Sequence, residues 1–129
     1  MFTEIIYVLL GLIVPQVIHA QDTVRLDPMP KRTVISGKDA RFFCSVSEGQ
    51  DVSISWTFGG ALLRSDDAKY RIMKGPAESI LTVIGARAND AGVYTCIGKN
   101  LLSEDRVSAT LVVEGILSRW VYNLSMTCL

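Results

Sequence analysis

The segment from Asp90 to Cys96, which reads Asp-Ala-Gly-Val-Tyr-Thr-Cys, decides how the rest of the sequence is interpreted. By itself it predicts a turn followed by a short strand that ends in a cysteine. Two upstream residues extend the pattern, because eleven residues separate Cys44 from Trp56 and 51 separate Cys44 from Cys96. Tyr94 stands two residues before the second cysteine. Four elements that agree in spacing are more specific than a lone pair of cysteines.

With this spacing, residues 24–114 resemble one domain of the immunoglobulin superfamily, nearest in pattern to the intermediate (I-type) set. The resemblance implies an all-β fold, an immunoglobulin-like Greek-key β-sandwich of two sheets, in a domain at residues 21–114. It also implies a Cys44–Cys96 disulfide between the sheets, with Trp56 packed over it and Leu81 in the core. Because a buried tryptophan N–H is a donor, Trp56 needs an acceptor or an opening to water.

The same resemblance gives roles to residues near the turn at Asp90. It implies that the hydroxyl of Tyr94 bonds to the backbone just upstream. It also implies an ion pair between Asp90 and an arginine near the fourth main strand, with Arg71 as the first candidate and Arg64 as the reserve. The glycine usual in the last hairpin is replaced by Ser103, so we expect a longer or differently bent hairpin there.

Alternation of apolar and polar residues predicts the strands themselves. Pro28 and Pro30 interrupt the first one, since proline cannot donate to a sheet ladder. This break resembles the point where the first strand of an I-type domain leaves one sheet and joins the other. The expected strands cover residues 24–26, 34–35, 39–46, 52–58, 61–63, 70–73, 79–84, 92–99 and 107–113.

Residues 1–20 are interpreted as a secretory signal peptide, which makes the expected location secreted or extracellular. The apolar run at residues 5–14 has the length of a signal core and is far shorter than the roughly 20 residues of a membrane span. Ala20 stands before the expected cut, whereas Glu4 departs from the positive charge usual in such signals. A buried N-terminal helix is the alternative, and such a helix has no place in this sandwich.

No enzyme is expected. The only histidine, His19, would leave with the signal, which excludes histidine-dependent nucleophilic catalysis and histidine-ligated metals. The adjacent acids at residues 66–67 and 104–105 are interpreted as turn and loop residues that aid solubility, not as a catalytic pair. Thirteen Lys and Arg balance thirteen Asp and Glu, without the concentrated positive face that nucleic-acid binding needs. We therefore expect no cofactor, metal, nucleic acid, small-molecule substrate or membrane span.

Residues 115–129 form a tail outside the expected domain. Asn123 begins the one glycosylation sequon of the chain. Cys128 remains unpaired once the expected disulfide has formed, and two interpretations stay open. It either forms an intermolecular disulfide that gives a covalent dimer, or it is a free or capped thiol.

The expected function is recognition, as the resemblance implies. The domain would bind itself or another cell-surface protein, as a truncated or secreted form of a larger receptor. Residues 53–56 and 94–97 resemble, more narrowly, the receptors related to the Down-syndrome cell-adhesion molecule. The alternative is a passive structural spacer of a larger extracellular or matrix protein. The fold alone does not decide between recognition and a spacer function.

Outward positions give two candidate surfaces. The preferred interface lies on the sheet of the second and fifth main strands and consists of Phe43, Ile80, Thr82 and Ile84, with Phe43 as its anchor. The outward positions of the other sheet include Val93 and Ile97, with Lys99 as the only charge. Exposed strands carry such residues for their β-propensity alone, which is the alternative for both surfaces.

Overall fold

Nine short strands account for most of residues 23–115, the part of the chain that the computed structural model describes. Most of them alternate between buried and exposed residues, as strands with one face in a core do. A short 3₁₀ helix, η2 (Ala88–Asp90), precedes the eighth strand. The strands are β1 (Arg25–Leu26), β2 (Arg32–Ile35), β3 (Ala40–Glu48), β4 (Ser53–Phe58), β5 (Ala61–Leu62), β6 (Tyr70–Lys74), β7 (Glu78–Val83), β8 (Gly92–Lys99) and β9 (Glu104–Glu114).

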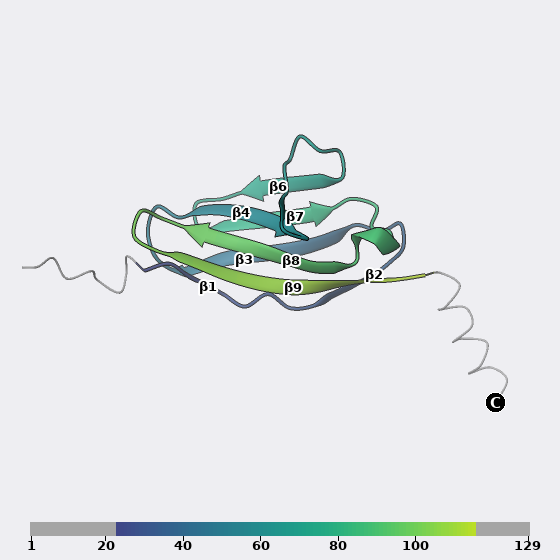
Figure 1. Cartoon of the computed structure of the whole chain (residues 1–129), viewed down its shortest axis with the longest axis horizontal. Coiled ribbons are helices and arrows are strands. Elements are labelled where there is room, and N and C mark those ends of the chain that lie inside the picture. The colour runs from purple at the N-terminus through teal and green to yellow at the C-terminus, as the bar shows by residue number, and fades with distance from the viewer. Residues whose placement is uncertain (1–22, 116–129) are drawn as a thin grey trace, which may run out of the picture.

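The strands form two layers (Figure 1). The four-stranded sheet has the order β1-β3-β7-β6, and the five-stranded sheet has the order β2-β9-β8-β4-β5. The start of the domain crosses between them, because β1 pairs antiparallel with β3 whereas β2 pairs parallel with β9. Pro28 and Pro30 lie in the crossing segment. The expected two-sheet immunoglobulin-like sandwich and its divided first strand are confirmed.

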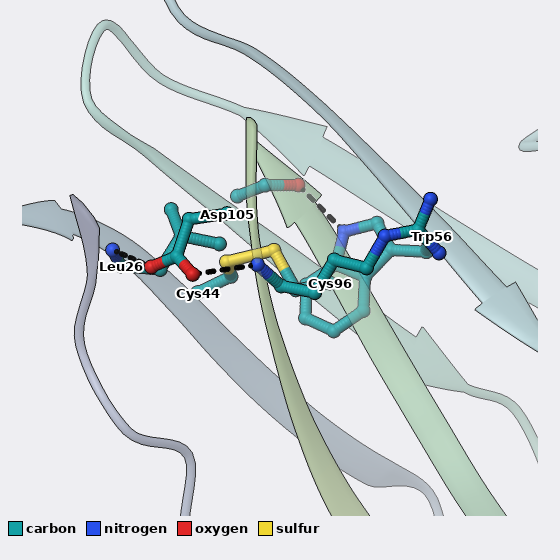
Figure 2. Close-up of a disulfide and its surroundings, with 7 residues drawn as sticks. Leu26, Cys44, Trp56, Cys96 and Asp105 are labelled. Atoms are coloured by element: carbon teal, nitrogen blue, oxygen red, sulfur yellow. Dashed lines mark hydrogen bonds between the residues drawn. A yellow bond between two sulfur atoms is a disulfide. The ribbon is translucent and has the colours of Figure 1, made fainter. Parts of the chain in front are cut away.

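The core lies between the two sheets and is built around the disulfide. Cys44 and Cys96 are bonded to each other, and Trp56 is fully buried beside them (Figure 2). The indole Nε1–H of Trp56 donates to Oγ of Ser79 at 2.9 Å, and both side chains are fully buried. Leu81 is buried as expected. Burial removes the indole N–H of Trp56 from water, and a serine of the opposite sheet accepts its hydrogen bond instead.

Aromatic stacking closes the other end of the core. The fully buried ring of Tyr94 stacks on Phe58 with ring centres 4.3 Å apart, and on Phe42 at 5.2 Å. The 5.2 Å distance lies in the favourable range for aromatic pairs, and the 4.3 Å distance, between nearly parallel rings, lies just below that range. Tyr94 thus bridges β3 of one sheet and β4 of the other.

The edge strand β1 and the residue before it are held by side chains of β9 and of the turn that precedes β9. The backbone N–H of Leu26 donates to Oδ2 of Asp105 at 2.8 Å, and that of Val24 donates to Oγ of Ser103 at 2.7 Å. The interpretation of Asp105 as a loop residue that aids solubility is wrong: it lies inside β9, half-buried, as the acceptor for an edge strand (Figure 2).

The last hairpin is short. Four residues, 100–103, join β8 to β9, and β9 already begins at Glu104. The side-chain Oδ1 of Asn100 accepts hydrogen bonds from the backbone N–H groups of Leu102 and Ser103, at 2.9 and 2.8 Å. No residue of this turn has a positive φ, so the turn needs no glycine. Of the two expectations for this hairpin, a longer turn is not found, whereas a differently bent one fits, because an asparagine side chain and not a glycine organises the turn.

Candidate recognition surface

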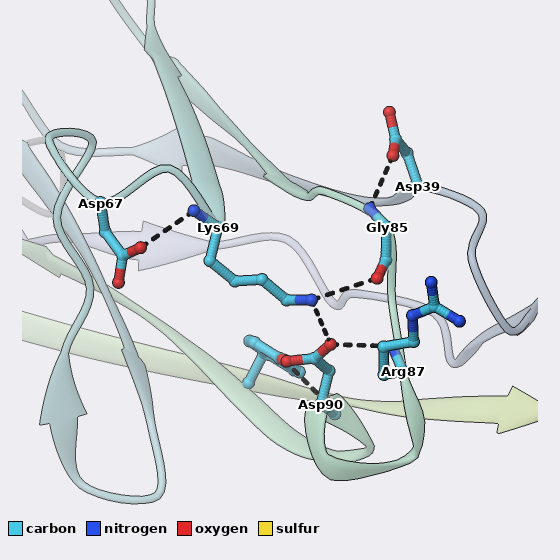
Figure 3. Close-up of polar contacts among 7 residues, drawn as sticks. Asp39, Asp67, Lys69, Gly85, Arg87 and Asp90 are labelled. Carbon is cyan, nitrogen blue, oxygen red and sulfur yellow. Dashed lines mark hydrogen bonds and ion pairs between the residues drawn. The ribbon is translucent and has the colours of Figure 1, made fainter.

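Asp90 anchors the turn between β7 and β8. Its Oδ2 lies 2.6 Å from Nζ of Lys69 and accepts the backbone N–H of Arg87 at 2.8 Å (Figure 3). The same ammonium group donates to the backbone carbonyl of Gly85 at 3.1 Å. One lysine therefore joins the segment before β6 to the loop that follows β7.

The expectation of an ion pair between Arg71 and Asp90 is wrong, because Asp90 pairs with Lys69. Arg71 lies within β6, opposite Thr82, and is exposed, and the reserve Arg64 pairs with Asp66 at 3.4 Å. Lys69 precedes β6 in a turn closed by the Tyr70 N–H and the Asp67 carbonyl. Strand alternation does not hold in that turn, so the lysine side chain can reach beneath the β7–β8 loop while Arg71 faces solvent.

Tyr94 completes this turn. Its hydroxyl donates to the backbone carbonyl of Asp90 at 2.7 Å, which is the bond that the family resemblance implies. Burial raises the pKa of the Tyr94 hydroxyl, and the neighbouring Tyr70 and Asp90 raise it further. The pKa of Tyr70 is also raised, by burial first and then by Asp90 and Asp67. Both phenols stay protonated near neutral pH, and the cluster is a structural element of the fold.

The outer face of the four-stranded sheet carries an apolar row. Phe43 on β3 is opposite Ile80 on β7, which is opposite Met73 on β6. The exposed fraction of Phe43 is 47% and that of Met73 is 58%, while Ile80 is half-buried. Residues directly opposite each other lie about 5 Å apart on one face. The sheet therefore presents three neighbouring apolar side chains to solvent at its centre.

Two of the four expected interface residues are less accessible than predicted. Thr82 faces outward in register but is only 5% exposed, so its assignment to an accessible surface is wrong. It sits on the central strand β7 between Arg41 of β3 and Arg71 of β6, which are long enough to cover it. Ile84, just after β7, is half-buried.

Arginines surround the apolar row. The guanidinium carbon of Arg32 lies 5.6 Å from the ring centre of Phe43, within cation–π range. The buried Nε of Arg32 has no hydrogen-bond partner. Arg41 and Arg71 form none of the ion pairs found in residues 23–115. We call the set of Arg32, Arg41, Phe43, Arg71, Met73, Ile80 and Thr82 the arginine–phenylalanine face.

A shallow hollow lies at one border of this face, between β2 and β3. Its lining includes Arg32, Val34, Asp39, Arg41 and Phe43. Asp39 is the one acid among them, and its Oδ1 already accepts the backbone N–H of Gly85 at 2.9 Å (Figure 3). The hollow thus combines two guanidinium groups, one aromatic ring and a carboxylate that the backbone already engages.

The outer face of the five-stranded sheet is more polar. Hydroxyls of Thr95 and Ser108 bond to each other at 2.8 Å, and Arg106 pairs with Glu104 at 3.2 Å. The expectation of Lys99 as the only charge is wrong, because β9 starts earlier than predicted and adds Glu104 opposite Lys99 and Arg106 opposite Ile97. Val93 is exposed there, but the polar and charged side chains of these two pairs already bond to each other.

Several expectations fall outside residues 23–115: the signal peptide with His19, the sequon at Asn123 and the thiol of Cys128. Within the described part of the chain, no helix is long and apolar enough to cross a membrane. The same residues contain no cluster of three or more His, Cys, Asp or Glu side chains arranged to hold a metal ion.

Comparisons with known proteins agree with this architecture. The family model described as "Immunoglobulin I-set domain" matches residues 24–113. Human palladin is 33% identical over 81 residues, which cover 63% of this chain and 6% of palladin. Cardiac-type myosin-binding protein C from mouse is 33% identical over 93 residues, which cover 67% of this chain and 7% of that protein.

A solved structure gives a further match. A chain from a mutant complex of titin M10 with the obscurin-like 1 immunoglobulin domain is 27% identical, with a TM-score of 0.64. The match covers 68% of this chain and 88% of that one. The chain thus has the fold of a whole immunoglobulin domain, but it spans only a small part of palladin or of myosin-binding protein C.

Proposed function

The chain belongs to the immunoglobulin I-set family, and we propose that it is an extracellular recognition domain that binds a protein through the arginine–phenylalanine face. The partner is another cell-surface protein or a second copy of the chain. One observation carries the proposal, the exposed row of Phe43, Ile80 and Met73 on the centre of a sheet. Aromatic residues, methionine and arginine are the types enriched in protein interfaces.

The size and setting of this row support a binding role. Leaving the exposed side chains of Phe43 and Met73 in water costs free energy, and a partner that covers them recovers this free energy. Arginine and aromatic residues also supply a large share of binding energy in measured interfaces. The matched chain from the complex of titin M10 with an obscurin-like 1 immunoglobulin domain has a similar fold and binds a protein in that complex. This likeness supports protein binding, not a particular partner.

The disulfide and the N-terminal sequence support an extracellular location. Disulfides persist in oxidising compartments and are rare in the cytosol, and the Cys44–Cys96 bond joins the two sheets. The apolar run at residues 5–14 adds the expected signal peptide. The test is the intact mass of the full-length product released by mammalian cells. A species that begins at Gln21 and gains two hydrogens on reduction supports the location. Retention in the cells with Met1 still present contradicts it.

A structural spacer is the second candidate function. The described part of the chain enters the sandwich at one end, near β1, and leaves it at the other, after β9 (Figure 1). That geometry suits a domain that keeps its neighbours apart along its long axis. The two curated relatives named above are also much longer than this chain.

Saturable binding separates the two functions. The secreted chain is labelled with a fluorophore and titrated onto intact cultured cells. Its self-association is measured by sedimentation in non-reducing buffer. A recognition domain gives binding that saturates and that unlabelled chain displaces. A spacer stays monomeric and gives only linear, non-displaceable background on every cell line, and that result would refute the recognition proposal.

A further inference from the structure

The arginine–phenylalanine face has an imbalance of charge that the sequence as a whole does not show. The complete chain has equal numbers of basic and acidic residues. Arg32, Arg41 and Arg71 nevertheless gather around the apolar row, and the hollow beside it contains one acid, Asp39. Arg25, Arg64 and Arg106 each form an ion pair with an acid, whereas Arg32, Arg41 and Arg71 form no ion pair within residues 23–115, so three unpaired guanidinium groups gather on this face.

The arginine of the hollow also has an unused donor. Nε of Arg32 is buried and has no hydrogen-bond partner, while its guanidinium lies against the ring of Phe43. A buried donor without a partner costs free energy, and a carboxylate is the acceptor whose geometry matches a guanidinium. Arg32 and Arg41 line the hollow together with Phe43, so the hollow offers a place for an acidic group next to an aromatic ring.

The spacing of the other two arginines extends this argument. Arg41 and Arg71 are the cross-strand neighbours of Thr82 on either side. Strands in a sheet lie about 4.8 Å apart, so the two arginine positions are separated by about 10 Å. A peptide in the polyproline II conformation has three residues per turn and advances about 3.1 Å per residue, so two acids three positions apart lie on one face about 9 Å from each other and match this separation. The row of Phe43 and Met73 lies alongside, where an intervening apolar side chain would contact it.

From these contacts we propose that the partner presents an acidic, extended protein segment in which an apolar side chain lies between two acids. The acids contact Arg41 and Arg71, with Arg32 available to a further carboxylate at the hollow, and the apolar side chain packs on Phe43 and Met73. This inference rests on the proposed recognition function and adds the chemistry of the partner. A protein segment is favoured over a polyanion such as DNA, because nucleic-acid backbones offer nothing to the exposed apolar row.

The test uses the full secreted chain and an array of labelled decapeptides. Each peptide contains two glutamates three positions apart with a phenylalanine or leucine between them, and each has a matched peptide with glutamines in place of the glutamates. Binding is measured by fluorescence anisotropy. We expect the best acidic peptides to bind at least about tenfold more tightly than their glutamine partners, since guanidinium–carboxylate bonds are strong ones. The difference should shrink at high salt.

Matched variants locate the site. Arg41→Gln with Arg71→Gln should remove the preference for acidic peptides, whereas Arg106→Gln on the other sheet should keep it. Thermal unfolding followed by circular dichroism verifies that each variant is folded. Equal binding of acidic and glutamine peptides, no binding of either, or an unchanged preference in the double variant each overturns the inference. A DNA oligonucleotide or heparin that displaces the peptides from the wild type and binds more tightly than they do also overturns it.

The recognition proposal can survive that failure. If the double arginine variant still binds cells as the wild type does, while Phe43→Ser does not, the face is a binding surface for a partner of different chemistry. If neither variant changes cell binding, the face itself has been assigned wrongly.

Discussion

The ion pair of Lys69 with Asp90 gives the sharpest test of the fold, because the sequence favoured a different partner. In Lys69→Met the chain loses the 2.6 Å contact to Asp90 and the 3.1 Å hydrogen bond to the carbonyl of Gly85. The aliphatic part of the side chain is retained, so the change reports mainly on the charge. Arg71→Met is the matched variant, which removes an exposed positive charge two residues away.

The magnitude follows from exposure. The side chain of Asp90 is 9% exposed and that of Lys69 is 29% exposed. Breaking a fully buried pair costs about 3–5 kcal/mol, and a hydrogen bond to a charged group contributes about 1.5–3 kcal/mol. Because the lysine is partly solvated, we expect Lys69→Met to lower the free energy of unfolding by about 2 kcal/mol. For a domain of this size that lowers the melting temperature by about 10 °C.

Urea denaturation at neutral pH, with the disulfide intact and circular dichroism as the signal, measures this loss. A double-mutant cycle with Asp90→Asn isolates the pair, and we expect a coupling energy of about 1–2 kcal/mol. Arg71→Met should cost less than about 1 kcal/mol. The reasoning is refuted if Arg71→Met destabilises more than Lys69→Met, or if the losses from Lys69→Met and Asp90→Asn are additive.

Three further predictions concern the core and the turn. Ser79→Ala leaves the buried indole N–H of Trp56 without its acceptor, and should lower the free energy of unfolding by about 1–3 kcal/mol in the same assay. Gly98→Ala places a Cβ 2.8 Å from Cδ2 of Leu26, and should cost about 1–3 kcal/mol by overpacking. The raised pKa of Tyr94 stabilises the fold below pH about 10, the usual value for the unfolded phenol, and this contribution is lost as the pH rises towards the folded value. Stability should therefore fall above pH 10, less steeply in Tyr94→Phe.

Each of these has a contradicting result. An unchanged unfolding midpoint in Ser79→Ala would mean that water replaces the hydroxyl. If Gly98→Ala has the same free energy of unfolding as the wild type, the side chain of Leu26 moves aside without loss of stability. Equal alkaline slopes for wild type and Tyr94→Phe would show that the phenol does not couple its ionisation to folding.

The sequence was sufficient for the parts of the fold that depend on local alternation. Cys44, Trp56, Leu81 and Tyr94 all point inward from strands of regular period two, so their burial could be predicted. The divided first strand followed from prolines that cannot join a ladder. In each case the physical signal lies within a few residues of the position concerned.

Long-range register and turn geometry were beyond that local signal. Lys69 lies in the turn before β6, where side chains do not alternate between the two faces as they do at Arg71, and its side chain therefore reaches Asp90. Alternation placed Thr82 on the outer face correctly, but its burial depends on which long side chains flank it across two strands. Asp105 supports Leu26 only because the two sheets meet at that edge.

The candidate surface was anticipated in part. Phe43 stood out as an aromatic at an outward position, and the structure leaves it exposed. The arginines around it come from three strands, β2, β3 and β6, that are distant in sequence. Met73 joins the row through its pairing with Ile80. No charge run in the sequence marks this gathering, because strand pairing creates it.

The most direct test of the recognition function compares Phe43→Ser with Val93→Ser. Both replace an exposed apolar residue, on β3 of one sheet and β8 of the other, with exposed fractions of 47% and 53%. The dissociation constant of each full-length variant is measured by titration onto cells that bind the wild type. We expect Phe43→Ser to weaken binding by about thirtyfold or more, as loss of an interface anchor does, while Val93→Ser stays within about twofold of the wild type. Equal binding by Phe43→Ser and the wild type, or a loss confined to Val93→Ser, would contradict this expectation.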